Sequence, residues 1–378
     1  MSQAESEWTF VSKGSKKSNR RNKKQNSGEL GHHGLYQQSN STSANNNNQR
    51  VRNQRGINES KRKDEITQSI LECMESLENQ YQSKEGFAHR LFEALSDATA
   101  QASVKHENGG IGDRYLNLRE IVVYGIGNFS CEPYSGPMLQ LAAALLLRRL
   151  AASKAPQSDV ISFSRDQQQT PMFYYEPCIL PLEKELLEDL FYVHILEGNE
   201  LGKLTVEEMQ QQLCLNEPPE SQSAKRSNND HTLFYMPHCP MRLYCNVMWA
   251  HWDHATYLPA SMQNKRMAAT TSATRNGSAN KNPIIIFGNS FHAYDDRTIY
   301  SEQRLDRTNG MFRLVQYATE RSVYSIAENR DVADSLRMLE RAFNDCNIIS
   351  FSTNGDTFPE RPKEYFASED PNENGELL

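Results

Sequence analysis

The sequence predicts an α/β fold: a mostly parallel, Rossmann-like open sheet flanked by helices and preceded by a disordered basic N-terminal arm. Two observations lead to this prediction. Short apolar runs, typical of buried strands, alternate along the chain with segments in which apolar residues recur at helical spacing. Such alternation builds βαβ units, whose strands lie parallel. In addition, hydrophobic residues make up 37% of the 378 residues, a low share for a chain that packs along its whole length.

Charge is spread unevenly along the chain. The formal net charge is -7, so the whole protein has no bulk attraction for nucleic acid. Between Ser12 and Lys63, however, thirteen Lys and Arg residues stand against two Glu, and apolar side chains are few. Such a segment cannot bury enough surface to offset its ordering entropy, so we expect it to be disordered. Its basic clusters fit a solubilising tail, a nuclear targeting signal or a weak nucleic-acid contact.

A helical segment is expected before the sheet. Apolar residues recur every three or four positions on both sides of Gly86, which predicts two successive helices or a helical hairpin. The apolar positions are Ile66, Ile70, Met74 and Leu77 before the glycine, and Phe87, Leu91 and Leu95 after it.

The sheet is expected to begin with residues 121–124, an apolar run that meets Gly125 in a turn. A helix follows over residues 137–150, because proline is favoured in the first turn of a helix. The other predicted strands are 160–163 or 172–175, 192–196, 233–236, 284–287, 322–326 and 348–351; the other predicted helices begin at Pro181 and cover 240–249 and 332–343.

Four parts are therefore expected along the chain, and two polar stretches without helical or strand periodicity interrupt the third part as surface insertions. The parts are a disordered basic arm at 1–63, a helical segment at 64–108, an α/β domain at 109–352 with insertions at 217–230 and 263–282, and an acidic tail at 353–378.

Small and polar residues follow the predicted strands where a ligand site is expected. In an open parallel sheet, ligands bind beyond the carboxyl ends of the strands, so the loops after several strands are candidates for one cleft. The candidate ligand-binding residues are Gly125, Gly127, Asn128, Glu176, His238, Gly288, Asn289 and Ser290.

Two readings remain open for the first of these loops. Its glycines allow a tight turn and a close backbone approach to a phosphate. Ser130 stands where a dinucleotide fingerprint has its third glycine, so the pattern favours a tight structural turn over a phosphate site. Likewise, Glu176 can bind a ribose hydroxyl, as in Rossmann folds, or cap the turn that follows it.

Metal binding and nucleophilic catalysis are not predicted. Cys239, Cys245, His251 and His254 are close in sequence, but no CxxC pair exists, so we predict no metal site. His238 and Cys239 are adjacent at a strand end and should point to different sides, which disfavours a catalytic dyad. We predict no catalytic residue. Trp249 and Trp252, expected to share a helical face, fit core packing or stacking on a ligand.

The cysteine pattern and the apolar segments indicate an intracellular protein. Seven scattered cysteines suit free thiols in a reducing compartment, and no secretory signal is recognised at the N-terminus. The most apolar stretch, residues 138–147, is shorter than the ~20 residues that a membrane-spanning helix needs. We therefore expect a cytoplasmic location without membrane contact.

Several motifs in order resemble the sensitivity-to-red-light-reduced-like family. The resemblance runs from about Leu118 to Phe291, and the start Glu7-Trp8-Thr9-Phe10-Val11 followed by basic residues is similar as well. Glu176 and His251 depart from the Asp and Asn that many members have. The matching motifs are YGIGNFS at 124–130, YEP at 175–177, EGNELGK at 197–203, TLFYMPHC at 232–239, the segment 243–252 and IFGNSF at 286–291.

The resemblance implies a non-enzymatic regulator linked to circadian clock input, clock gene expression and control of haem biosynthesis, in the cytoplasm and also in the nucleus. It supplies no catalytic residue to transfer, no cofactor, and no named partner beyond a protein or a small ligand. The alternative from the residues themselves is a nucleotide-binding enzyme of unknown reaction that uses the strand-end cleft, with the glycine loop and Glu176 as its binding elements.

Overall fold

The computed structural model describes residues 43–81, 86–102, 116, 118–152, 170–198, 202–214, 231–255, 283–297, 313–323 and 334–352. Two compact units divide the chain, residues 1–55 and residues 56–378, and the sheet, its two cores and the candidate site belong to the second. The predicted strand at 160–163, the two polar insertions and the acidic tail lie outside the described residues, as does the predicted arm up to residue 42.

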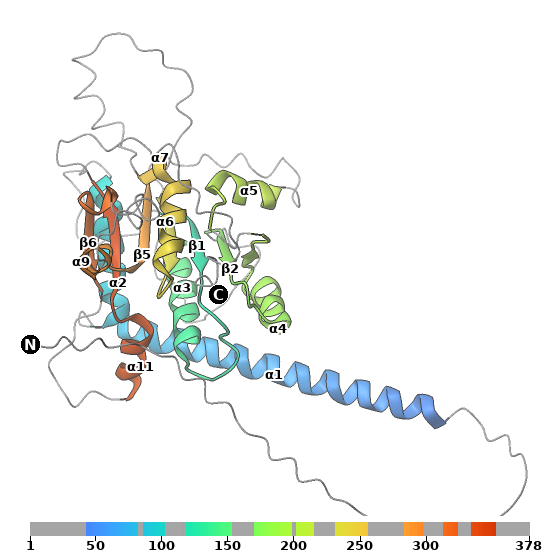
Figure 1. Cartoon of the computed structure of the whole chain (residues 1–378). Coiled ribbons are helices and arrows are strands. Elements are labelled where there is room, and N and C mark those ends of the chain that lie inside the picture. The colour runs from blue at the N-terminus through green and yellow to red at the C-terminus, as the bar shows by residue number, and fades with distance from the viewer. Residues whose placement is uncertain are drawn as a thin grey trace, which may run out of the picture. The chain divides into compact units, whose positions relative to one another are not determined.

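A seven-stranded sheet forms the centre of the second unit (Figure 1). Its order is β3-β2-β1-β4-β5-β7-β6, and the first five strands in this order are parallel. β7 runs antiparallel to β5, and β6 antiparallel to β7. The mostly parallel open sheet is therefore confirmed. The strands are β1 Leu118–Tyr124, β2 Met172–Tyr175, β3 His194–Ile195, β4 His231–Met236, β5 Ile284–Asn289, β6 Ala318–Ser322 and β7 Cys346–Phe351.

The central strands are buried along almost their whole length because helices cover both faces. β4 is buried at every position, and β1 at all but one. Alternate residues of β1 enter two different cores: Ile121 and Val123 on one face, Val122 and Tyr124 on the other. Continuous apolar runs of this kind are typical of parallel strands that are buried on both sides.

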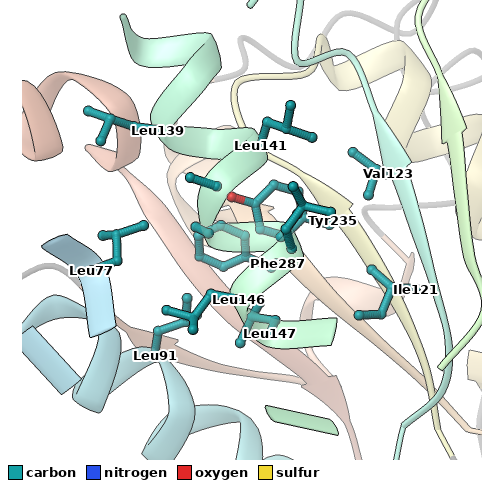
Figure 2. Packing of buried hydrophobic residues seen from close by; sticks show 14 of the residues in the cluster. Leu77, Leu91, Ile121, Val123, Leu139, Leu141, Leu146, Leu147, Tyr235 and Phe287 are labelled. Atoms are coloured by element: carbon teal, nitrogen blue, oxygen red, sulfur yellow. The ribbon is translucent and has the colours of Figure 1, made fainter. Parts of the chain in front are cut away.

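Six helical segments supply the first core. Figure 2 shows Leu139, Leu141, Leu146 and Leu147 packed over Tyr235 and Phe287 of the sheet, with Leu77 and Leu91 beside them. The segments are α1 Ser43–Tyr81, α2 Phe87–Ala102, α3 Gly136–Ala152, α4 Pro181–Glu185, the π-helix η1 Leu186–Leu190 and α11 Asp334–Phe343.

Four helices cover the opposite face and form the second core with side chains such as Met209, Tyr244, Trp252 and Phe291. They are α5 Val206–Cys214, α6 Met241–Ala250, α7 Trp252–Ala255 and α9 Phe291–Arg297. α5 is also held by a polar network: buried Glu120 accepts hydrogen bonds from Gln210 Nε2 and from Thr232 Oγ1, both at 2.5 Å.

Buried Arg148, at the C-terminal end of α3, joins three segments. Its guanidinium donates to the carbonyl oxygens of Thr170 at 2.8 Å, Phe191 at 2.5 Å and Tyr192 at 3.1 Å. Burial lowers its pKa to about 10. The side chain thus binds the residues before β2 and after η1 to α3, and it is called the Arg148 clamp below.

Several predicted elements differ in extent from those observed. α1 begins at Ser43, before the boundary expected at residue 64; no proline interrupts its N-terminal part, where Arg and Gln favour helix although the asparagines at 45–48 and Gly56 do not. The strand expected at 322–326 lies earlier, at Ala318–Ser322. α6 ends at Ala250, so Trp249 and Trp252 do not share one helix, and Trp252 is buried in the second core.

A membrane-spanning helix is not found among the described residues, since none of their helices combines the necessary length and apolar character.

Candidate functional site

The parallel register brings the predicted loops together at the carboxyl ends of the strands, which are called the sheet edge below. Tyr124 at the end of β1 pairs with Tyr175 at the end of β2, and Met236 at the end of β4 pairs with Gly288 in β5. The chain leaves β1 toward β2 and β3 on one side, while β4 and β5 extend the sheet on the other. This reversal between β1 and β4 is the place where open α/β sheets bind ligands.

The turn after β1 depends on its two glycines. Gly125 and Gly127 have φ of 64° and 80°, a region that favours glycine. A Cβ on Gly125 would also lie 2.8 Å from Cys239 Sγ, so the residue lets the β1 and β4 loops approach closely. Space is open around Gly127, where only the backbone conformation demands glycine.

Two glutamate side chains accept hydrogen bonds from backbone amides of this turn. Glu176, directly after β2, accepts from Gly127 N at 2.8 Å and from Cys178 N at 3.1 Å. Glu183, fully buried in α4, accepts from Ser130 N at 2.8 Å and from Leu180 N at 3.0 Å. Amides that would cradle a phosphate in a nucleotide-binding loop are thus bound to the protein's own carboxylates. Glu183 was not predicted as a site residue, because its bond to Ser130 N joins residues 53 positions apart, which local sequence pattern does not reveal.

The β4 and β5 loops are joined in a similar way. His238, with φ of 55°, donates its backbone N–H to Asn289 Oδ1 at 3.1 Å. Asn289 Nδ2 donates to Tyr294 Oη at 2.8 Å, and that hydroxyl donates to Cys239 O at 3.1 Å. The structure therefore brings His238 and Asn289 together, but it uses the Asn289 amide in bonds within the protein.

Gly288 is required by a tyrosine that the sequence analysis missed. Tyr244 of α6 is fully buried, and its hydroxyl donates to Met236 O and accepts from Asn289 N at 2.9 Å. A Cβ on Gly288 would overlap that hydroxyl and lie 2.8 Å from Tyr244 Cε1. Burial raises the pKa of Tyr244 well above its ordinary value, so it is a neutral hydrogen-bonding group.

Ser290 and Glu320 cap the start of α9. Ser290 Oγ accepts from Ala293 N at 3.0 Å, the usual role of a serine before a helix. Glu320 of β6 accepts from Phe291 N at 2.7 Å and His292 N at 3.0 Å. Here too a carboxylate of the protein takes the amides that an anionic ligand would need. Glu320 lies on a strand that is far away in sequence, so local pattern could not reveal it.

The thiols at this edge are buried and protonated. Cys239 is 2% exposed, and burial raises its pKa far above the ordinary value. Burial likewise raises the pKa of Cys346 to about 12. A nucleophilic or metal-binding cysteine must be a thiolate, so neither residue is suited to that chemistry near neutral pH.

Three polar oxygen atoms near the β1 turn are not satisfied. Within the described part of the chain, Asn128 Oδ1, Ser130 Oγ and Tyr174 Oη are buried and have no hydrogen-bond partner. Buried polar atoms in folded proteins nearly always form hydrogen bonds, with the protein or with bound molecules. These three oxygens therefore mark the part of the sheet edge where a bound molecule could supply the missing partners. Of the predicted residues, Asn128 is the one with such an atom.

Comparisons with known proteins agree with the resemblance seen in the motifs. The family model described as the SRR1 domain matches residues 112–350, more than half of the chain and all of the loops above. The chain is similar to Protein SENSITIVITY TO RED LIGHT REDUCED 1 of Arabidopsis thaliana, with 24% identity over 201 residues, 53% of this chain and 50% of that protein.

A second relative is an SRR1-like protein of Mus musculus, 28% identical over 132 residues, which are 35% of this chain and 38% of the relative. The chain thus spans half or less of the curated relatives that it matches. No solved structure matches it. By the extent of the domain match, this chain belongs to the SRR1 family.

Proposed function

We propose that this protein is a non-enzymatic regulator whose carboxyl sheet edge binds a small ligand or a partner protein. The finer role is the one that the family resemblance implies: circadian clock input and clock gene expression, together with regulation of haem biosynthesis, in the cytoplasm and the nucleus. The name of the Arabidopsis relative, which refers to sensitivity to red light, is in keeping with a signalling role.

One observation carries the non-enzymatic part of the proposal. Carboxylates of Glu176 and Glu183 accept hydrogen bonds from the amides of Gly127 and Ser130 in the glycine turn. A phosphate would have to displace these carboxylates and then lie beside their negative charge. The buried, protonated thiols of Cys239 and Cys346 also offer no nucleophile at this edge.

The second candidate is a nucleotide-binding enzyme, and the position of the glycine turn at the reversal of strand order favours it. The two candidates differ in a thermal-shift screen of nucleotides and S-adenosylmethionine. A regulator of the proposed kind is not stabilised by millimolar nucleotide, whereas an enzyme that binds its nucleotide with micromolar Kd gains several degrees in Tm.

The regulatory role is tested in cells that lack the protein. Wild-type protein should restore circadian period and haem content, whereas Asn128→Ala should restore neither at equal protein level. Asn128 is preferred to Asn289 for this purpose because its Oδ1 has no partner, while the Asn289 side chain makes two bonds within the protein. Gln211→Ala, at an exposed position of α5, is the matched control and should act like wild type. Full rescue by Asn128→Ala would show that the regulatory role does not depend on this sheet edge.

The basic arm provides targeting or weak nucleic-acid contact in this proposal. RNA binding through the arm should depend steeply on salt and disappear when residues 1–63 are deleted. If the full chain shows no salt-sensitive binding, the arm has a targeting or solubilising role.

A further inference from the structure

The β1–α3 and β2–α4 turns form one polar junction, defined here by Asn128, Ser130, Tyr174, Glu176 and Glu183. Two amide-to-carboxylate bonds hold it together, Gly127 N to Glu176 and Ser130 N to Glu183. Tyr174 lies in β2 two residues before Glu176, which directly follows the strand. Val123 pairs with Tyr174, which puts the tyrosine beside the last residues of β1.

Tyr174 is the most deeply buried hydroxyl-bearing residue of this junction. It is fully buried on the face covered by α3 and η1, where Glu183 is also fully buried. Burial, together with the charges of Glu176 and Glu183, raises the pKa of its hydroxyl well above the ordinary value. The hydroxyl nevertheless has no hydrogen-bond partner, and neither does Ser130 Oγ, although Ser130 is only 9% exposed.

The junction is rich in acceptors and poor in donors. Each of the four carboxylate oxygens of Glu176 and Glu183 accepts one backbone N–H. A carboxylate oxygen has two lone pairs, so each keeps capacity for a second donor. Asn128 Oδ1 adds an acceptor, and the two unpartnered hydroxyls can accept as well as donate. An anion is disfavoured here, whereas a cation with several N–H groups matches both the charge and the lone pairs.

The geometry points to a binding site for a protonated primary amine at this junction, with Tyr174 and Ser130 as unpartnered contacts and Glu176 and Glu183 as the countercharges. An ammonium group brings three N–H donors and a positive charge in a compact volume. This inference rests on the proposed function, because it names the ligand class of the same sheet edge.

The test is thermal unfolding of the full chain at constant ionic strength with methylammonium, ethanolamine or putrescine. Tetramethylammonium has the same charge but no N–H, and inorganic phosphate has the opposite charge. Primary amines should raise Tm with concentration in a saturable way, while tetramethylammonium and phosphate leave it unchanged. Equal shifts with tetramethylammonium, or no shift with any primary amine, would overturn the inference.

Two tyrosine variants make the test specific to the junction. Tyr174→Phe removes an unpartnered hydroxyl, so the variant should fold with unchanged or higher Tm and bind the amine at least tenfold more weakly. Tyr235→Phe, one strand away from β1, removes a buried hydroxyl that donates to Gln140 O at 2.8 Å; it should lower Tm but keep the amine shift. Wild-type affinity in Tyr174→Phe would refute the assignment.

Failure of this inference can be told apart from failure of the proposed function. If no amine binds and Asn128→Ala still fails to restore period and haem content, the edge is functional but takes another ligand. If amines bind and Asn128→Ala rescues fully, the site exists without the proposed cellular role.

Discussion

His238 Nε2 lies 3.0 Å from the carbonyl oxygen of Ala342, so a loop of the sheet edge caps the C-terminal end of helix α11. This carbonyl belongs to the last turn of the helix, where carbonyl groups have no partner within the helix. Gln140 Nε2 of α3 donates to the same oxygen at 2.8 Å. The β4 loop, α3 and α11 are thus joined at a single atom, which couples the candidate edge to the first core.

Replacing Gln140 should show how much its hydrogen bond to Ala342 O stabilises the folded protein. Gln140→Leu keeps the apolar contacts of the buried side chain but removes the 2.8 Å bond to Ala342 O. We expect a loss of about 1–2 kcal/mol in the free energy of unfolding, since His238 still caps the carbonyl. Urea denaturation followed by circular dichroism measures it. A double variant with His238→Ala should lose more than the sum of the single changes; strict additivity would show that the two donors act independently.

Gly288 should tolerate no side chain while Tyr244 is present. Gly288→Ala places a Cβ against the Tyr244 hydroxyl and 2.8 Å from its ring, which displaces a group bonded to Met236 and Asn289. We expect about 3 kcal/mol of destabilisation from overpacking and broken bonds. Adding Tyr244→Phe should recover only part of this loss, because the ring carbon remains too close. Gly127→Ala is the comparison: the space there is open, so only backbone strain of about 1 kcal/mol is expected.

The sequence predicted the sheet better than the site because the two are encoded differently. Continuous apolar runs such as residues 121–124 and 284–287 report burial directly, and both are strands as predicted. The helix that begins at Pro181 was predicted as one element, yet it continues as a π-helix from Leu186, a change of hydrogen-bond register that apolar spacing does not specify.

The candidate residues were predicted from their position after strands. That criterion does not identify the groups with which these residues form hydrogen bonds. Asn289 follows the predicted strand 284–287 and looked free to bind a ligand, but it is the last residue of β5, and Tyr294 and the backbone of His238 bind its side-chain amide. Glu183 and Glu320 complete the turns from distant segments. Only tertiary packing brings such pairs together, so one sequence cannot assign them.

Arg148 should be among the most sensitive residues of the first core. Arg148→Met fills a similar volume but leaves the carbonyls of Thr170, Phe191 and Tyr192 without donors. We expect a loss of at least 3 kcal/mol, measured by urea denaturation, because each unsatisfied buried carbonyl costs about 1 kcal/mol or more. Arg148→Lys reaches fewer of the three carbonyls and should lie between wild type and Arg148→Met. Equal stability of all three proteins would contradict the clamp.

Thiol labelling should divide the described cysteines into two classes. Cys131 and Cys178 are exposed and should react with iodoacetamide in the native protein within minutes at pH 8. Burial raises the pKa of Cys73 and Cys346 to about 12 and that of Cys239 further, and Cys245 is buried as well, so these four should react only after denaturation. Mass spectrometry of the labelled peptides gives the assignment.

The raised pKa values of the buried thiols determine how the free energy of unfolding responds to alkaline pH. A thiol with an ordinary pKa of about 8.5 in the unfolded chain loses its proton there first, while its folded counterpart keeps it until about pH 12. The unfolded state then binds fewer protons, so the free energy of unfolding falls as pH rises above about 8.5, by up to ~1.4 kcal/mol per pH unit for each buried thiol. Cys346→Ala should fall less steeply than wild type between pH 8.5 and 10 in urea titrations. An identical slope in the two proteins would mean that Cys346 is not protonated and buried as the fold requires.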